Sequence, residues 1–138
     1  MNEKSKGFFE IAHKNKTIAH LYDLNLFEDS SFPTPPEMEL QFGYGFIKES
    51  KILDMHIHKK VRRQTINTSE FLFVISGKMK VEILAEDKTT VKRVELTNNQ
   101  CLLQFIGGHK ISFEANTKYF EIKQGPYLGR DKDKLIIK

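Results

Sequence analysis

Residues 56–77 have the sequence HIHKKVRRQTINTSEFLFVISG, and most of what the chain predicts about fold and chemistry follows from this stretch. Side chains at positions i and i+2 of a β-strand lie on the same face, so a strand here points His56 and His58 in one direction. Further along, Glu70 opens the apolar run FLFVI. Burying a carboxylate is costly unless a partner stabilises its charge. Two imidazoles and a carboxylate on one side of a fold therefore indicate most of a metal site.

The run FLFVIS that follows Glu70 is apolar on both of its faces. Leu72 and Val74 share the face of Glu70, while two phenylalanines and an isoleucine take the other. A strand of this kind is covered on both sides, here by the interior of a barrel and by another layer. A partner subunit is the economical second layer in a chain this small, so the pattern predicts a homodimer.

Length and composition place the chain among soluble globular proteins. Its 138 residues suit one domain, and 39% are hydrophobic while 29% are charged. The longest unbroken apolar run, FLFVI, is too short to span a bilayer, and MNEKSKGFFE does not resemble a secretory signal. The single cysteine, Cys101, excludes an internal disulfide framework and fits a reducing compartment. We therefore expect a cytoplasmic protein without a membrane partner.

A formal net charge of +4 raises the question of nucleic-acid binding. The basic residues are scattered and mixed with acidic ones, and KKVRR at residues 59–63 is the one compact basic run. Scattered charge is typical of a solvated surface, so no nucleic-acid partner is predicted.

Short alternating or apolar runs recur along the chain with Gly, Asn, Ser or Pro between them, which is typical of an all-β fold. SSFPTPPE, with three prolines, predicts a loop because proline cannot donate to a sheet ladder. The expected strands are FFEIAH, TIAHLYDL, LQFGYGFIK, KILDMHIHK, the run from about Arg63 to Ser76, KMKVEILAE, TVKRVEL, CLLQFI, HKISFEA and KYFEIKQ. So many short strands predict a single-domain sandwich or small barrel.

A third histidine enters at GGHK, where His109 follows two glycines and opens the strand HKISFEA. Adjacent glycines permit close backbone approach or unusual dihedral angles. Three histidines and a carboxylate suit a divalent transition metal such as Fe, Mn, Ni or Zn. The sequence leaves an alternative open, in which Leu53, Met55 and Ile57 face the core and the histidines lie in solvent with no metal.

These residues resemble the motifs of the cupin superfamily, G-x5-HxH-x3–4-E-x6-G followed by G-x5-PxG-x2-H-x3-N. HIH supplies His56 and His58, EFLFVISG supplies Glu70 with the E-x6-G spacing, and GGHK supplies His109. The resemblance covers roughly residues 40–124. It implies a small single-domain cupin with a jelly-roll β-barrel, in which these four residues are the metal ligands.

The chain departs from the family motifs at several positions. Eleven residues separate His58 from Glu70, where the family has three or four, so Gln64 is an alternative fourth ligand. In the first motif, Ser50 stands in place of the opening glycine. In the second motif, Gly, Pro, Gly and Asn are replaced in turn by Asn98, Gln104, Ile106 and Phe113. The second motif therefore rests on His109 and its surroundings.

The resemblance also divides the chain into three parts. Residues 1–39 are expected to form N-terminal strands and a Pro-rich loop that pack on the barrel or on a partner subunit, residues 40–124 the barrel core, and residues 125–138 a peripheral tail. The end of the last strand, EIKQGPYLGRDKDK, is similar to the tail of small cupins associated with sugar and surface-polysaccharide metabolism.

The expected ligand is a small polar molecule such as a sugar or sugar derivative. A metal would polarise one of its oxygens as a Lewis acid in an isomerase or epimerase step. The alternatives are an Fe-dependent oxygenase, a non-catalytic binding module and a metal-free epimerase.

Four residues near the histidines are weaker site candidates. Asp54 shares the face of His56 in a regular strand and is a candidate acid/base. Arg62, Arg63 and Gln64 are candidate substrate contacts, because an arginine grips a carboxylate or phosphate with two hydrogen bonds. The opposing interpretation is a solvated hairpin turn.

Overall fold

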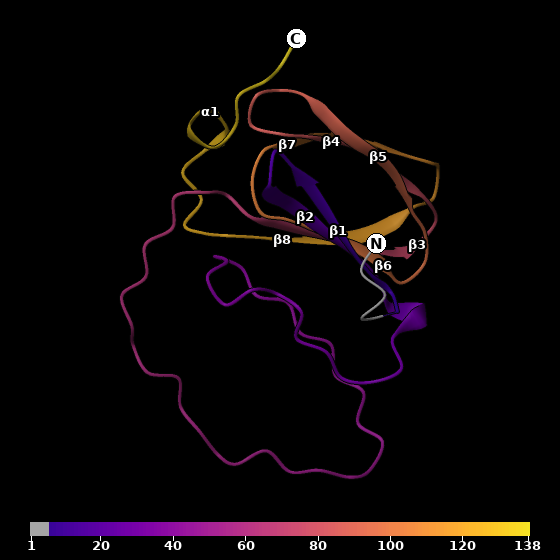
Figure 1. The fold of residues 1–138 in the computed structure, drawn as a ribbon, viewed down its shortest axis with the longest axis vertical. Helices are drawn as coiled ribbons and strands as arrows, with labels where there is room; N and C mark the ends of the chain where they lie inside the picture. The colour runs from indigo at the N-terminus through magenta and orange to yellow at the C-terminus, as the bar shows by residue number, and fades with distance from the viewer. Residues whose placement is uncertain (1–5) are drawn as a thin grey trace.

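The computed structural model describes residues 6–138 and is built almost entirely from β-strands (Figure 1). The all-β prediction is therefore confirmed. In chain order the elements are β1 (Phe8–His13), β2 (Lys16–Asp23), the 3-10 turn η1 (Leu24–Leu26), β3 (Glu70–Ser76), β4 (Met79–Leu84), β5 (Thr90–Leu96), β6 (Gln100–Gln104), β7 (Gly108–Phe113), β8 (Lys118–Lys123) and the helical turn α1 (Arg130–Asp133).

The strands form two antiparallel sheets, one of five strands in the order β1-β2-β6-β3-β8 and one of three in the order β5-β4-β7. Figure 1 shows the smaller sheet lying over the larger one. Among residues 6–138, no strand pairing joins one sheet to the other, so the two sheets are not closed into a barrel. No helix in this range is long and apolar enough to cross a membrane.

The core lies between the two sheets, because apolar and polar side chains alternate along the strands and the apolar ones point inward. In β4, Met79, Val81 and Ile83 are buried, while Lys80 between them is exposed. In β3, Leu72 and Val74 of the predicted inner face are almost fully buried. Residues i, i+2 and i+4 of a strand share one face, so these short segments each contribute one apolar side to the same interior.

The outer face of the five-stranded sheet is covered by residues 27–44 of the same chain. Tyr22 of β2 is fully buried because Phe42 stacks on it, with ring centroids 4.1 Å apart, and Phe42 also stacks on Phe71 of β3 at 5.7 Å. The expected second layer over β3 is thus provided in part by this segment. Further along β3, Ile75 remains 49% exposed on the same outer face.

Two of the expected strands do not form in the single chain. LQFGYGFIK contributes one isolated bridge, between Ser31 and Tyr44, and KILDMHIHK has no strand structure at all. The prediction of strands there is wrong for a physical reason. Alternation makes a segment suitable for a sheet, but a strand exists only where a neighbour pairs with its backbone groups. Residues 45–69 instead run as a wide excursion away from both sheets (Figure 1).

Candidate functional site

Glu70 and His109 meet in the structure although 38 residues separate them in the sequence. Glu70 is the first residue of β3 and pairs with Gln104 of β6, on the face that turns towards the smaller sheet. His109 lies at the start of β7 opposite the buried Ile83. Its Nε2 atom is 3.3 Å from Oε2 of Glu70, and the two side chains are 20% and 15% exposed. Two of the four residues predicted as metal ligands are thus in contact.

Gln104 fixes the orientation of the His109 ring. Its amide nitrogen donates to the carbonyl oxygens of Ile106 and Gly108, at 3.0 and 2.7 Å, so its amide oxygen faces His109. That oxygen lies 2.7 Å from Nδ1, which must therefore be the donor. Donation to the Glu70 carboxylate as well requires a second proton on Nε2, and a metal ion bound there would take the place of that proton. A ring nitrogen held by such a second partner is the usual arrangement for a metal-binding histidine.

The carboxylate of Glu70 is held in its ionised form. The hydrogen bond from His109 is the main cause, and it lowers the pKa of Glu70 from 4.5 to about 2 although partial burial acts in the opposite direction. Glu121 of β8 lies beside it, and sharing a hydrogen bond with Glu70 raises the pKa of Glu121. Two carboxyl groups this close disfavour ionisation of the second. Lys123 adds a compensating positive charge nearby.

A glycine turn sets the position of His109. Gly107 has φ of +81°, in the left-handed region, and a side chain there would collide with the carbonyl oxygen of Leu84. A non-glycine residue would be strained by its dihedral angle and by this close approach. The turn therefore places His109 beside β4. The two glycines of GGHK are the sequence signal for such a close backbone approach.

The remaining predicted site residues lie on the excursion and are exposed. The ring of His56 contacts its own segment, with Nδ1 2.7 Å from the carbonyl oxygen of Asp54, and its centroid is 5.2 Å from that of His58. Arg63 makes a long local contact of 3.5 Å to the carbonyl oxygen of Val61. Arg62 and Gln64 are likewise exposed on the same excursion.

The single chain thus brings together two of the four predicted ligands. Within the described range, residues 6–138, no group of three or more His, Cys, Asp or Glu side chains is arranged to hold a metal ion. Glu70 and His109 have suitable donor atoms and a suitable supporting residue. His56 and His58 form a second pair on the excursion, with ring centroids 5.2 Å apart.

Two further residues belong to the site although the sequence did not single them out for it. Gln104 interrupts the apolar run CLLQFI, and Glu121 interrupts KYFEIK. A lone polar side chain inside an apolar strand was the signal that identified Glu70, and the same signal applies to Gln104. Glu121 carried no comparable signal, because its strand also contains exposed charged ends.

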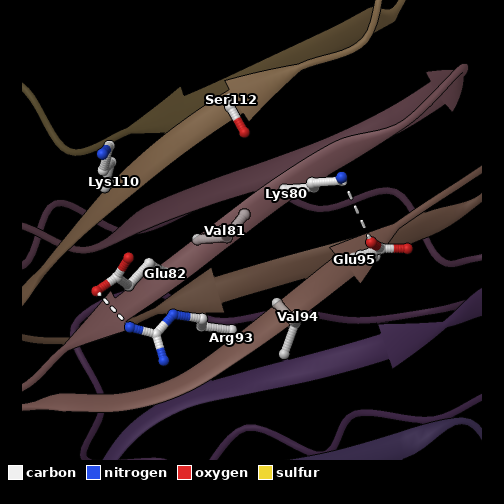
Figure 2. Close-up of a pocket in the computed structure, with 8 residues that line it drawn as sticks. All are labelled: Lys80, Val81, Glu82, Arg93, Val94, Glu95, Lys110 and Ser112. Atoms are coloured by element: carbon white, nitrogen blue, oxygen red, sulfur yellow. Dashed lines mark hydrogen bonds and ion pairs between the residues drawn. The ribbon is translucent and has the colours of Figure 1, made fainter.

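Two surface hollows among the described residues lie away from this pair. One, of about 420 Å³, sits on the outer face of the three-stranded sheet and is shown in Figure 2. Ion pairs cross it, from Arg93 to Glu82 at 3.3 Å and from Lys80 to Glu95 at 3.8 Å. Exposed pairs of this kind are usual on a solvated sheet face. The other hollow, of about 790 Å³, opens between β1 and β5. Neither is lined by Glu70 or His109.

His20 is the second histidine with a buried environment, but it has a structural role. Its Nδ1 is 2.8 Å from the hydroxyl of Tyr22, and its ring packs edge-on against Phe8 and Phe105. Burial lowers the pKa of His20 to about 4, so the ring is neutral at physiological pH.

No protein-family model, curated protein or solved structure matches the chain. The functional argument therefore rests on the geometry described above.

Proposed function

We propose that this protein is a small cupin-like, metal-dependent protein that binds a small polar molecule such as a sugar derivative. The observation that carries the proposal is the meeting of Glu70 and His109, 3.3 Å apart, where Glu70 opens a segment with the E-x6-G spacing. A carboxylate and an imidazole side by side suit a divalent transition metal of the Fe, Mn, Ni or Zn class. The hydrogen bond from His109 to Gln104 supports this role because it leaves Nε2 directed towards Glu70.

The jelly-roll barrel belongs to the same proposal. Eight antiparallel strands in two sheets support it, and closing the barrel requires further pairing at the free edges of those sheets. Arg62, Arg63 and Gln64 remain proposed contacts to a polar ligand, and Asp54 remains a proposed acid/base. Their exposure on the excursion leaves their polar groups accessible.

A metal-free acid–base site is the second candidate, and one observation favours it. Glu70, His109 and Gln104 already form a continuous hydrogen-bonded chain without any further group. A carboxylate and an imidazole in contact can pass a proton to or from a hydroxyl group of a bound molecule. They can do the same at a carbon atom next to a carbonyl group. On this reading the isomerase or epimerase chemistry is the same and the metal is absent.

Metal content distinguishes the two candidates. We expect about one transition metal per chain when the protein is purified without an affinity tag and analysed by elemental mass spectrometry. His109→Ala should lose it. His13→Ala is the matched control, because His13 is paired with Asp87 at 3.3 Å on the surface and should not affect the metal.

The opposite result also has a defined meaning. If the wild-type protein holds no metal after incubation with Fe, Mn, Ni and Zn, the metal-dependent proposal is wrong. A panel of nucleotide sugars, followed by a thermal-shift assay and by product analysis, would then separate a metal-free enzyme from a binding module. A shift without turnover would favour the binding module.

A further inference from the structure

The hollow of about 790 Å³ between β1 and β5 lies at one pair of sheet edges, and the Glu70–His109 pair lies near the other pair, β7 and β8. β1 and β5 lie against each other, but within residues 6–138 no strand pairing joins them. Small-molecule sites usually have volumes of about 300 to 1,000 Å³ and mostly apolar walls. The hollow therefore has the size of a binding site that is separate from the Glu70–His109 pair.

The wall of this hollow is mostly apolar and is formed by Phe9, Ile11, Leu21 and Val94. The first three come from the paired strands β1 and β2, where Phe9 lies opposite Leu21, and Val94 of β5 lies opposite the buried Val81. Among the described residues, Phe9 is a half-buried aromatic side chain outside the hydrophobic core cluster. Its ring therefore offers apolar surface that the core does not use.

Lys92 brings a positive charge to this apolar wall. It lies opposite the buried Ile83 and two residues from Val94, so it is on the face of β5 that turns towards the smaller sheet's buried side. Lys80 and Arg93 of the same sheet each contact a glutamate carboxylate, at 3.8 and 3.3 Å. Within residues 6–138, the ammonium group of Lys92 has no such ion pair and no hydrogen bond, so it is available to a ligand.

Glu10 also lines the hollow but does not pair with Lys92. It lies opposite His20 in the pairing of β1 with β2, on the outer face of the large sheet that His20 shares with Tyr22. Its carboxylate accepts a hydrogen bond of 2.7 Å from the hydroxyl of Thr17. The two charged residues therefore belong to different faces, and the positive charge is the one that stands at the inner wall.

We propose that this hollow binds a small amphipathic carboxylate. Its hydrocarbon body lies against Phe9, Ile11 and Leu21, and its carboxylate accepts a hydrogen bond from the ammonium group of Lys92. Removing a hydrocarbon body from water favours binding, and a charge-assisted hydrogen bond fixes the orientation of the head group. One lysine matches the single charge of a carboxylate. A sugar does not suit this wall, because its hydroxyl groups would lose hydrogen bonds against apolar side chains.

A small molecule is favoured over a strand from another protein. The free edges of β1 and β5 have unpaired backbone groups, which an extended peptide could bind in principle. An inward-pointing lysine on an edge strand is, however, one of the features that prevent such pairing. Lys92 therefore disfavours an added strand and favours an anionic head group at the same place.

Isothermal titration calorimetry with sodium octanoate tests the proposal. We expect saturable binding of about one octanoate per chain. The alcohol 1-octanol has the same body without the carboxylate, and acetate has the same head group without the body. Each should bind at least about tenfold more weakly than octanoate, because each lacks one of the two contributions.

Two variants and a matched control assign the binding to this hollow. Lys92→Gln should weaken octanoate binding by at least about tenfold, since it removes the positive charge. Phe9→Ala should weaken binding through the apolar wall and leave the fold intact, because Phe9 lies outside the core cluster. Lys110→Gln is the control. Lys110 is an exposed lysine of the same sheet that lies opposite Glu82 on the outer face, so its replacement should not change the affinity.

Three results would overturn the proposal. They are the absence of saturable octanoate binding, equal affinities for octanoate and 1-octanol, and equal losses of affinity in Lys92→Gln and Lys110→Gln. Any of them would mean that Lys92 only keeps other strands from the edge of β5. Glu70→Gln should leave octanoate binding unchanged, so failure of this site is distinct from failure of the proposed metal site.

Discussion

Glu70 and His109 differ in their surroundings from residues 51–58, which carry the other two histidines that the cupin resemblance implies as ligands. The first pair is held between sheets with several hydrogen bonds, and the histidines of residues 51–58 are exposed on an extended excursion. The difference shows that a motif places its residues only where the backbone around them is paired. β3 and β7 have neighbours that fix them, and residues 51–58 have none in the same chain.

The largest test of this difference compares the core with the excursion. Leu72→Ala in β3 should lower the free energy of unfolding by about 2 to 5 kcal/mol, because Leu72 is 1% exposed and its removal leaves a cavity. Ile66→Ala should change it by no more than about 0.5 kcal/mol, because Ile66 is 90% exposed. Urea unfolding measures both. Similar losses for the two variants would show that the excursion is packed against something in solution.

The next largest expected effect is the acid sensitivity of the Glu70–His109 pair. The folded-state pKa of Glu70 is lowered from 4.5 to about 2, so its contribution to stability is present above pH 4.5 and is lost as the pH falls towards 2. The lowering corresponds to an upper bound of about 3.4 kcal/mol, which solvent screening and coupling to Glu121 reduce. Unfolding free energies measured between pH 5 and pH 2 should therefore fall less steeply in Glu70→Gln than in the wild type. Equal slopes would contradict the ion pair with His109.

The smallest expected change in stability concerns Glu121, whose carboxyl group lies beside Glu70. The pKa of Glu121 is raised by its contact with Glu70, so its ionised form at neutral pH opposes folding. Glu121→Gln should stabilise the protein slightly at pH 7 and lose this advantage in acid, where the wild-type group is protonated. Thermal unfolding at the two pH values gives the comparison. A loss of stability at pH 7 would mean that Glu121 is held by a positive partner.

Sequence patterns predicted the strands that alternate and also have neighbours. KMKVEILAE and TVKRVEL appear as β4 and β5, which pair with each other across a tight turn, and KYFEIKQ appears as β8, which pairs with the distant β3. KILDMHIHK alternates equally well and failed, because alternation reports the suitability of a segment for a sheet and not the presence of a partner. The pairing of a distant segment depends on the whole topology, which a local pattern does not contain.

The site was predictable to the same degree. Glu70 stood out because a carboxylate at the start of an otherwise apolar strand needs a partner, and His109 stood out because it follows two adjacent glycines. Gln104 could have been found by the same rule, since it sits in CLLQF and is 3% exposed. The contact of Glu121 with Glu70 could not, because their diagonal relation across β3 and β8 depends on the pairing register.

The contacts at the base of the excursion have a consequence for how the chain can be divided. Glu39 binds the amides of Ile66 and Asn67, and Gln124 joins the carbonyl oxygen of Glu39 to the amide of Ser69. A break in the peptide chain between these anchors leaves every strand intact. β1 and β2 then belong to one fragment and β3 to β8 to the other, with β2 paired to β6 across the division. The protein is therefore suited to a split format, in which two separately expressed pieces reassemble without a linker.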